Sequence, residues 1–225
     1  MKEINRLPLW YNNSYIGGFN NKKTEKCKEI IYKSNQFDVV SIGWGREISL
    51  LYDGWVYSRV ENTATCVCPY INTMVNILTC LRNPPKRILL GGGGAGTAGI
   101  AMNIQFPGCK MIAVEISSEV INIGKEYFGA NSIPGFTYIQ DDLSLYINNV
   151  KKDEFDVIML DCYEGINVPQ CLDEAFIVKC FSLLPDNGAI VFNMPHNQRV
   201  LRSVYKTLCE QGLMGDWVWR EGSTQ

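Results

Sequence analysis

The sequence predicts an α/β fold in which a parallel sheet follows a small antiparallel β domain. From residue 84 onward, short apolar segments alternate with segments of helical periodicity, a pattern typical of a parallel sheet covered on both faces. Residues 37–68 are instead rich in β-branched and aromatic residues, punctuated by turn-forming residues. A run of glycines follows the first apolar segment of the second part. We therefore expect two domains, residues 1–82 and residues 83–225.

Composition excludes several classes of protein. Of the 225 residues, 46% are hydrophobic and 20% charged, so we expect a folded chain. The net charge is −2 and the basic residues are scattered, which argues against a nucleic-acid partner. The apolar runs are too short for a membrane span, and no apolar segment of a signal peptide follows Met1. These features favour a cytoplasmic protein that does not bind membranes.

Cysteine and histidine usage bears on redox state and on metals. The nine cysteines lie mostly inside apolar stretches, so we interpret them as small buried hydrophobic residues in a reducing compartment. Only one spacer residue separates Cys66 from Cys68, and the chain has a single histidine. A metal site is therefore not expected.

The first part predicts a small antiparallel sheet. We expect strands at residues 39–42, 48–52 and 55–58, with Asp53-Gly54 forming a tight hairpin turn between the last two. Apolar residues then recur at helical spacing through residues 69–81, which predicts a helix that packs on the second domain.

The second part predicts five strands, each followed by a helix. Ser117 or Ser118 can cap the second helix. The expected strands are 87–90, 111–115, 136–140, 155–160 and 189–192; the expected helices end near 102, cover 117–128 and 143–150, start near 173, and cover 198–211.

The C-terminal residues 212–225 suffice for one more strand, at Trp217-Val218-Trp219. A sheet ending there would expose an apolar edge, which is prone to pair with another chain. We therefore expect a homodimer, or another closure of that edge.

Acidic residues and glycines mark the strand ends, where ligands of an open parallel sheet bind. The first strand runs into Gly91–Gly96, the second ends in Glu115, the third in Asp141-Asp142, and the fourth in Asp161. Glycines permit sharp turns and close approach of a ligand, and a carboxylate at Glu115 can accept two ribose hydroxyls. One of the two adjacent aspartates can instead cap the following helix.

This pattern favours an adenosine ligand without phosphates. A dinucleotide site would explain the glycines and Glu115 but has less use for the acids after strands three and four. The glycines are not followed by the Walker-type lysine that binds the phosphates of a nucleoside triphosphate. The residues therefore indicate S-adenosylmethionine rather than NAD.

Several motifs taken together resemble the spermidine-synthase family and its methyltransferase-like relatives. The resemblance covers about residues 51–192. It rests on Leu51-Tyr52-Asp53-Gly54, the glycine segment 88–97, Val114-Glu115-Ile116 with Glu119-Val120-Ile121, Asp141-Asp142-Leu143, and the strand 156–161 that ends in Asp161.

The resemblance implies a Rossmann-like class I methyltransferase fold and a set of site residues. Asp161 would face the acceptor, and a loop from Tyr163 to Gln170 would close over it. Tyr163 would stack on the sulfonium or pack the loop, and Glu164 would contact an amine or remain a surface charge. The implied cofactor-binding residues are Gly91, Gly92, Gly93, Gly94, Gly96, Glu115, Ile116, Asp141 and Asp142.

Three departures from the family pattern shape the functional prediction. Gly94 replaces an aspartate of the glycine signature, and Asp161-Cys162-Tyr163-Glu164-Gly165 alters the catalytic segment. The family's polyamine-binding element, Tyr-His-Glu-Met, is missing; Tyr70 and Met74 are its nearest match, without the His or the Glu. Loss of the aspartate removes repulsion with the carboxylate of full S-adenosylmethionine. We therefore expect transfer of a methyl or related group from the full cofactor to a small-molecule acceptor, with amines among the candidates.

Other functions stay open at this point. An aminopropyltransferase would use decarboxylated S-adenosylmethionine and bind polyamines. A non-catalytic binding protein would keep the cofactor site without turnover, and an intramolecular cyclase or lyase would need no acceptor pocket. His196, after the fifth strand, is either a solvated loop residue or a substrate contact.

Overall fold

A computed structural model of the chain describes residues 28–62, 64–162 and 173–193, together with residues 203, 206, 207, 209 and 210. Within these residues the chain forms two five-stranded sheets. No helix of the described part is long and apolar enough to cross a membrane.

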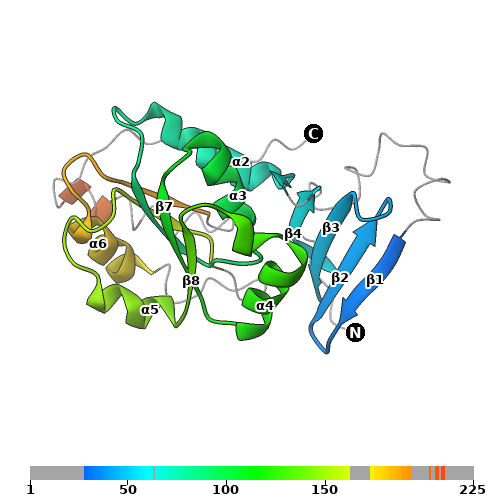
Figure 1. Cartoon of the computed structure of the whole chain (residues 1–225). Coiled ribbons are helices and arrows are strands. Elements are labelled where there is room, and N and C mark those ends of the chain that lie inside the picture. The colour runs from blue at the N-terminus through cyan, green and yellow to red at the C-terminus, as the bar shows by residue number, and fades with distance from the viewer. Residues whose placement is uncertain are drawn as a thin grey trace.

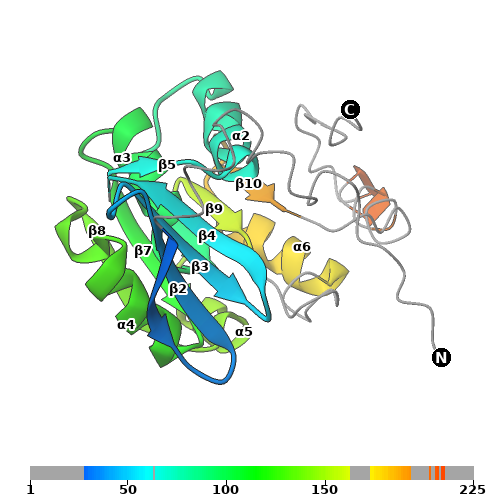
Figure 2. The same cartoon turned by 90° about the vertical axis from the view of Figure 1, so that its right-hand side faces the viewer.

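The N-terminal sheet is an antiparallel meander in which the strands lie side by side in chain order (Figure 2). The predicted hairpin at Asp53-Gly54 is confirmed, because both residues have positive φ (47° and 81°) and Tyr52 pairs directly with Trp55. The sheet consists of β1 (Lys28–Lys33), β2 (Phe37–Ile42), β3 (Glu47–Tyr52), β4 (Trp55–Glu61) and β5 (Thr65–Cys66).

Strand β1 was not predicted from the sequence. It carries Lys28, Glu29 and Lys33 and is largely exposed, so it lacks the apolar alternation that marks the inner strands. Charged residues on an edge strand disfavour pairing with other chains, which explains why this strand has so weak a pattern.

The second sheet is parallel throughout, in the order β10-β9-β6-β7-β8. The first strand of this sheet, β6, lies at its centre. Strands β7 and β8 follow on one side of β6, and β9 and β10 then follow on its other side. The neighbours β6 and β9 therefore form the topological switch point. The strands are β6 (Arg87–Gly91), β7 (Lys110–Glu115), β8 (Phe136–Gln140), β9 (Val157–Leu160) and β10 (Ala189–Phe192).

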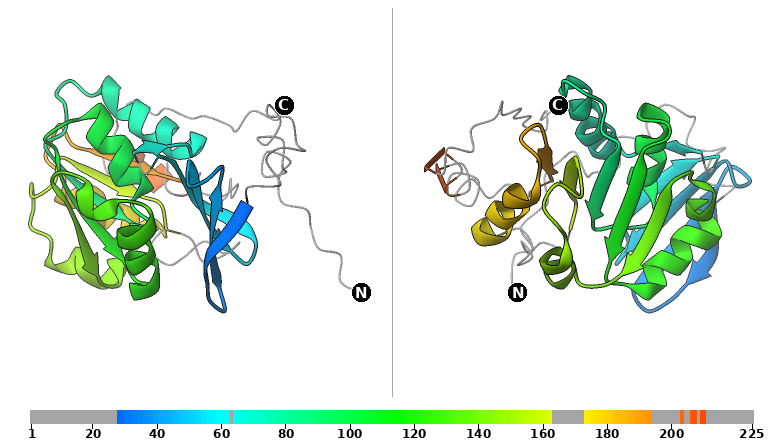
Figure 3. Two further views of the ribbon diagram at one scale, coloured as in Figure 1. Left: turned by 45° about the vertical axis from the view of Figure 1, so that its right-hand side comes forward. Right: turned by 60° about the vertical axis from the view of Figure 1, so that its left-hand side comes forward.

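Helices separate the two sheets and cover the far face of the parallel sheet (Figures 1 and 3). Helices α2, α3 and α4 lie on the side of the N-terminal sheet, whereas α5 and α6 lie on the opposite side. Their bounds are α2 (Pro69–Ile77), α3 (Thr97–Gln105), α4 (Ser118–Tyr127), α5 (Leu143–Tyr146) and α6 (Glu174–Leu183).

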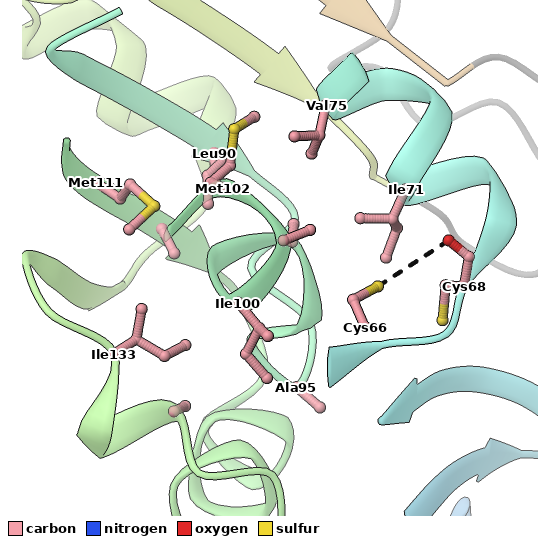
Figure 4. Packing of buried hydrophobic residues seen from close by; sticks show 14 of the residues in the cluster. Cys66, Cys68, Ile71, Val75, Leu90, Ala95, Ile100, Met102, Met111 and Ile133 are labelled. Carbon is pink, nitrogen blue, oxygen red and sulfur yellow. Dashed lines mark hydrogen bonds between the residues drawn. The ribbon is translucent and has the colours of Figure 1, made fainter. Parts of the chain in front are cut away.

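Alternate strand residues build the two cores. Ile88 and Leu90 of β6 pack into the core shared with α2, α3 and the N-terminal sheet, whereas Leu89 packs against α5 and α6, because successive side chains point to opposite faces of a strand. Figure 4 shows part of the first core, in which Cys66 and Cys68 lie beside Ile71. Both thiols are buried, as predicted.

Local sequence explains where the helices begin. Pro69 opens α2, at a position where its missing N–H costs nothing. Ser117, rather than Ser118, caps α4 by accepting a hydrogen bond from the Val120 N–H. The helix expected at 143–150 is shorter: α5 ends at Tyr146 and continues as a 3-10 turn over Ile147–Asn149.

Strand β9 begins at Val157, two residues later than predicted. Asp156 instead joins the amino ends of the central strands. Its carboxylate accepts hydrogen bonds from the backbone N–H groups of Lys86 and Arg87 and from the Arg87 guanidinium, at 2.8–2.9 Å.

The two sheets pack through one continuous core. The Tyr32 hydroxyl of β1 donates a 2.9 Å hydrogen bond to Glu119 of α4, and one buried cluster contains residues of both sheets. The boundary predicted after residue 82 stays a prediction, as does the sixth strand at Trp217–Trp219, which lies outside the described residues.

Asp156→Asn should lower the free energy of unfolding at pH 7 by about 1 kcal/mol, because a charged acceptor of three hydrogen bonds is lost from a partly exposed site. Burial alone would raise the pKa of Asp156, but the hydrogen bonds from Arg87 and from the two N–H groups outweigh it and lower that pKa. The contribution of the Asp156 carboxylate to the free energy of unfolding should be present above the pKa of this group in the unfolded chain. It should disappear as the pH falls through the lowered pKa of the folded state. Urea unfolding of both proteins between pH 7 and pH 2.5 measures this. A difference that grows toward low pH would contradict the assignment.

Candidate functional site

The glycine loop connects β6 to α3 at the switch point. Gly92, Gly94 and Gly96 have φ of 80°, 50° and 87°, a left-handed conformation that glycine adopts without strain. A Cβ at Gly92 would lie 2.3 Å from the Asp161 carbonyl oxygen. The loop therefore passes directly against the end of β9, and Asp161 N–H donates to the Gly91 carbonyl at 2.8 Å.

Glu115 lies at the end of β7 with its carboxylate directed at this loop. The side chain is buried (6% exposed). One oxygen accepts a 2.9 Å hydrogen bond from the Gly94 N–H and the other a 3.0 Å bond from the Ser117 N–H. Each carboxylate oxygen has further acceptor capacity, so Glu115 can orient the loop and still accept hydroxyl donors.

The next strand end carries the paired aspartates. Asp142 is the N-cap of α5, accepting hydrogen bonds from the N–H and the hydroxyl of Ser144. Asp141 accepts from the Asp142 N–H. The capping role weighed for one of the two residues thus falls to Asp142. Ile116, which follows Glu115, is 67% exposed and offers an apolar surface on which a flat ring could pack.

Asp161 stands at the end of β9 between two neutral donors. Its Oδ2 accepts a 3.1 Å hydrogen bond from the Tyr70 hydroxyl of α2, and its Oδ1 accepts a 3.0 Å bond from the amide of Asn193. Asn193 is held in turn because its N–H donates to the Leu160 carbonyl at the end of β9. Three elements distant in sequence therefore fix one carboxylate.

Burial governs the protonation of Asp161. It raises the pKa of this carboxyl to about 6, although hydrogen bonds from Asn193 and Tyr70 favour the ionised form and limit the rise. A carboxyl with a pKa close to neutral can exchange a proton with a substrate at physiological pH.

The N-terminal sheet closes the site from the opposite side. A Cβ built at Gly94 would have the Ser58 hydroxyl oxygen at 3.6 Å and the Tyr57 ring at 3.8 Å. Burial raises the pKa of Tyr57, and the nearby Glu115 and Asp161 raise it further. Tyr57 is thus a neutral hydroxyl beside two acids, supplied by β4.

The structure brings together most of the residues that the sequence singled out. The glycines, Glu115 and Asp161 surround one end of the parallel sheet, and Tyr70 joins them. The predicted residues Tyr163, Glu164 and His196 and the helix 198–211 lie wholly or mainly outside the described residues, and their roles stay predictions.

Sequence reasoning missed Tyr57 and Asn193. Asn193 could have been found, because it directly follows a predicted strand at the ligand-binding edge. Tyr57 could not, because its position depends on how the two sheets pack together.

The sequence model of the Spermine/spermidine synthase domain matches residues 67–211. The chain belongs to this family. The match includes α2, the glycine loop and the ends of the strands that carry the candidate site, and so confirms the resemblance seen in the motifs.

Curated relatives fall into two groups. A polyamine aminopropyltransferase of Vibrio vulnificus is 29% identical over 148 residues, covering 61% of this chain and 49% of the relative. The mouse eEF1A lysine and N-terminal methyltransferase is 28% identical over 152 residues, covering 60% of this chain and 22% of the relative. The chain thus spans about half the length of the first relative and about a fifth of the second.

Solved structures support the fold. The crystal structure of a probable spermidine synthase from Corynebacterium glutamicum has a TM-score of 0.69 at 18% identity, covering 81% of this chain and 70% of that one. The Rossmann-like fold with an N-terminal antiparallel sheet is therefore confirmed. Homologues of the chain include aminopropyltransferases and methyltransferases, which supports a transferase that uses an S-adenosylmethionine-related ligand.

Titration of Asp161 provides a direct test of the site. With the aspartate carboxyl carbons labelled with ¹³C, Asp161 should titrate near pH 6, whereas the pKa of Asp156 should lie below the ordinary aspartate value. Tyr70→Phe should raise the Asp161 midpoint further, because it removes a donor that favours the carboxylate. Since the folded pKa is raised, the stability linked to this group should be lost as the pH rises from about 4 to about 6. An Asp161 midpoint below 4 would contradict the described geometry.

Proposed function

We propose that the chain is a transferase that uses full S-adenosylmethionine and transfers its methyl group to an amine of a small molecule. The observation that carries this proposal is the glycine at residue 94, where the family has an aspartate. Its backbone N–H contacts Glu115, and no side chain projects toward Tyr57 and Ser58.

The residues present fit such a ligand. The Glu115 carboxylate can accept ribose hydroxyls, Ile116 offers an apolar surface, and Asp141 and Asp142 lie at the next strand end. A Cβ at Gly94 would already be in van der Waals contact with Ser58 and Tyr57, so the lack of a side chain would leave that volume to the carboxylate of the methionine tail. When bound, the sulfonium supplies an electrophilic carbon and a neutral leaving group.

Asp161 is the candidate base. An amine is protonated at neutral pH and must lose a proton before or during its attack. A carboxylate with a pKa near 6 can accept that proton, and Tyr70 and Asn193 keep it in one orientation. Positioning of the acceptor against the methyl carbon would supply much of the remaining acceleration.

The residues after Tyr70 argue against a polyamine acceptor. Ile71 is buried in the core (2% exposed), and the Asn72 amide donates to the Cys66 carbonyl. Neither offers a carboxylate to the site. A polyamine carries several positive charges and would need further acids, so an acceptor with one amine fits better. The dimer and the cytoplasmic location expected from the sequence remain part of this proposal.

Gly94→Asp should reverse the cofactor preference. The wild-type chain should bind full S-adenosylmethionine at least 10-fold more tightly than the decarboxylated form. An aspartate at this position would repel the carboxylate of the full form and attract the free amine of the other, and either effect is worth roughly 1–2 kcal/mol near a protein surface. Calorimetric titration with both ligands measures the ratio.

Gly94→Asn is the matched control, because asparagine has the same shape as aspartate and also tolerates positive φ. It should weaken both ligands equally. Tighter binding of the decarboxylated form by the wild-type chain would restore aminopropyl transfer, and binding of neither would refute the proposed cofactor.

Asp161→Asn should lower turnover by roughly 10²–10⁴-fold, with cofactor affinity changed less than about 3-fold. Release of S-adenosylhomocysteine in the presence of a panel of small primary amines measures turnover. Asp156→Asn, the same change at the other end of β9, is the control and should retain activity well below its melting temperature. Equal activity of the Asp161 variant and the wild type would exclude Asp161 as the base.

A further inference from the structure

We propose that Tyr138 is a positioning residue, which holds the glycine loop in the shape that receives the methionine tail. This inference deepens the proposed function and rests on it for the identity of the ligand. Tyr138 lies in β8, two strands away from the start of the loop.

The Tyr138 hydroxyl donates a 2.9 Å hydrogen bond to the Gly94 carbonyl oxygen. The Gly94 N–H meanwhile donates to Glu115 at 2.9 Å. Both backbone polar groups of Gly94 are thus fixed by side chains from neighbouring strands. The orientation of this residue is thereby determined before any ligand arrives.

Several glycines make room for this tyrosine. A Cβ would lie 2.9 Å from the Tyr138 ring if built at Gly93, and 3.1 Å from its hydroxyl oxygen if built at Gly96. On helix α4, a Cβ at Gly124 would lie only 2.7 Å from the same oxygen. The glycines of the loop therefore do more than admit a ligand, because they also admit the tyrosine beneath the loop.

The tyrosine itself is firmly placed. Its ring meets Phe136 edge-on, with centroids 4.8 Å apart, and Gly99 of α3 leaves the space that Phe136 occupies. Burial raises the pKa of the Tyr138 hydroxyl, and the nearby Glu115 raises it further. The hydroxyl therefore remains a hydrogen-bond donor throughout the physiological pH range.

Tyr138→Phe tests the role, because it removes the hydroxyl and keeps the ring. Loss of one hydrogen bond should weaken binding of S-adenosylhomocysteine about 3- to 10-fold, while binding of methylthioadenosine, which lacks the amino-acid tail, should change less than 2-fold. In the ligand-free protein, hydrogen exchange at residues 92–97 should accelerate several-fold without an equal change at β7. Tyr32→Phe is the matched control, since it removes a tyrosine hydrogen bond of the same 2.9 Å length outside the loop.

Gly124→Ala approaches the same contact from the helix. The added methyl group would displace the Tyr138 hydroxyl and crowd the Ala95 carbonyl, so it should reproduce the loss for S-adenosylhomocysteine even though alanine favours the helix. Equal losses for both ligands, or unchanged exchange in the loop of Tyr138→Phe, would overturn the proposal. If the wild-type chain binds neither ligand, the proposed function fails, whereas the exchange measurement still decides whether Tyr138 holds the loop.

Discussion

The parallel pairing of β6 with β9 is the contact on which the site depends. These strands are far apart in the chain, yet Gly91 and Leu160 lie in register and the Asp161 N–H reaches the Gly91 carbonyl. The pairing places the glycine loop directly against the catalytic candidate. It also requires Gly92 to lack a side chain, because the Asp161 backbone occupies that space. A ligand that contacts the loop therefore lies next to the residue that carries this carboxylate.

The two sheets contribute different kinds of group to this place. The parallel sheet supplies carboxylates at its strand ends, each held by backbone N–H groups or neutral donors. The N-terminal sheet and α2 supply hydroxyl groups, from Tyr57, Ser58 and Tyr70. Acids on one side and neutral aromatic rings on the other suit a ligand that carries a positive sulfonium next to an apolar ring system. Neither sheet forms this environment alone.

Much of the fold could be predicted because the chemistry is local. Apolar strands, the Asp53-Gly54 turn and a serine cap at 117 or 118 each act within a few residues, and the described residues confirm the turn, a cap at Ser117 and strands close to those predicted. Strand β1 was missed because an exposed edge strand lacks apolar alternation, and the start of β9 was misplaced because Asp156 serves neighbouring strands instead. In the site, the acids were visible at strand ends, whereas Tyr57 reaches the loop from the other sheet and Tyr138 reaches it from a strand two places away. Their positions depend on packing that no local pattern encodes.

The meeting of Tyr138 with Gly124 has a consequence for the history of the chain. The Tyr138 hydroxyl oxygen fits only because helix α4 has no side chain at residue 124. Substitutions at residues 124 and 138 are therefore not independent. A larger residue on the helix would first require a smaller residue on the strand. Among homologues, residues 124 and 138 should therefore change together. A glycine inside helix α4, which by itself lowers helix stability, would then be explained by the tyrosine on β8 that packs against it.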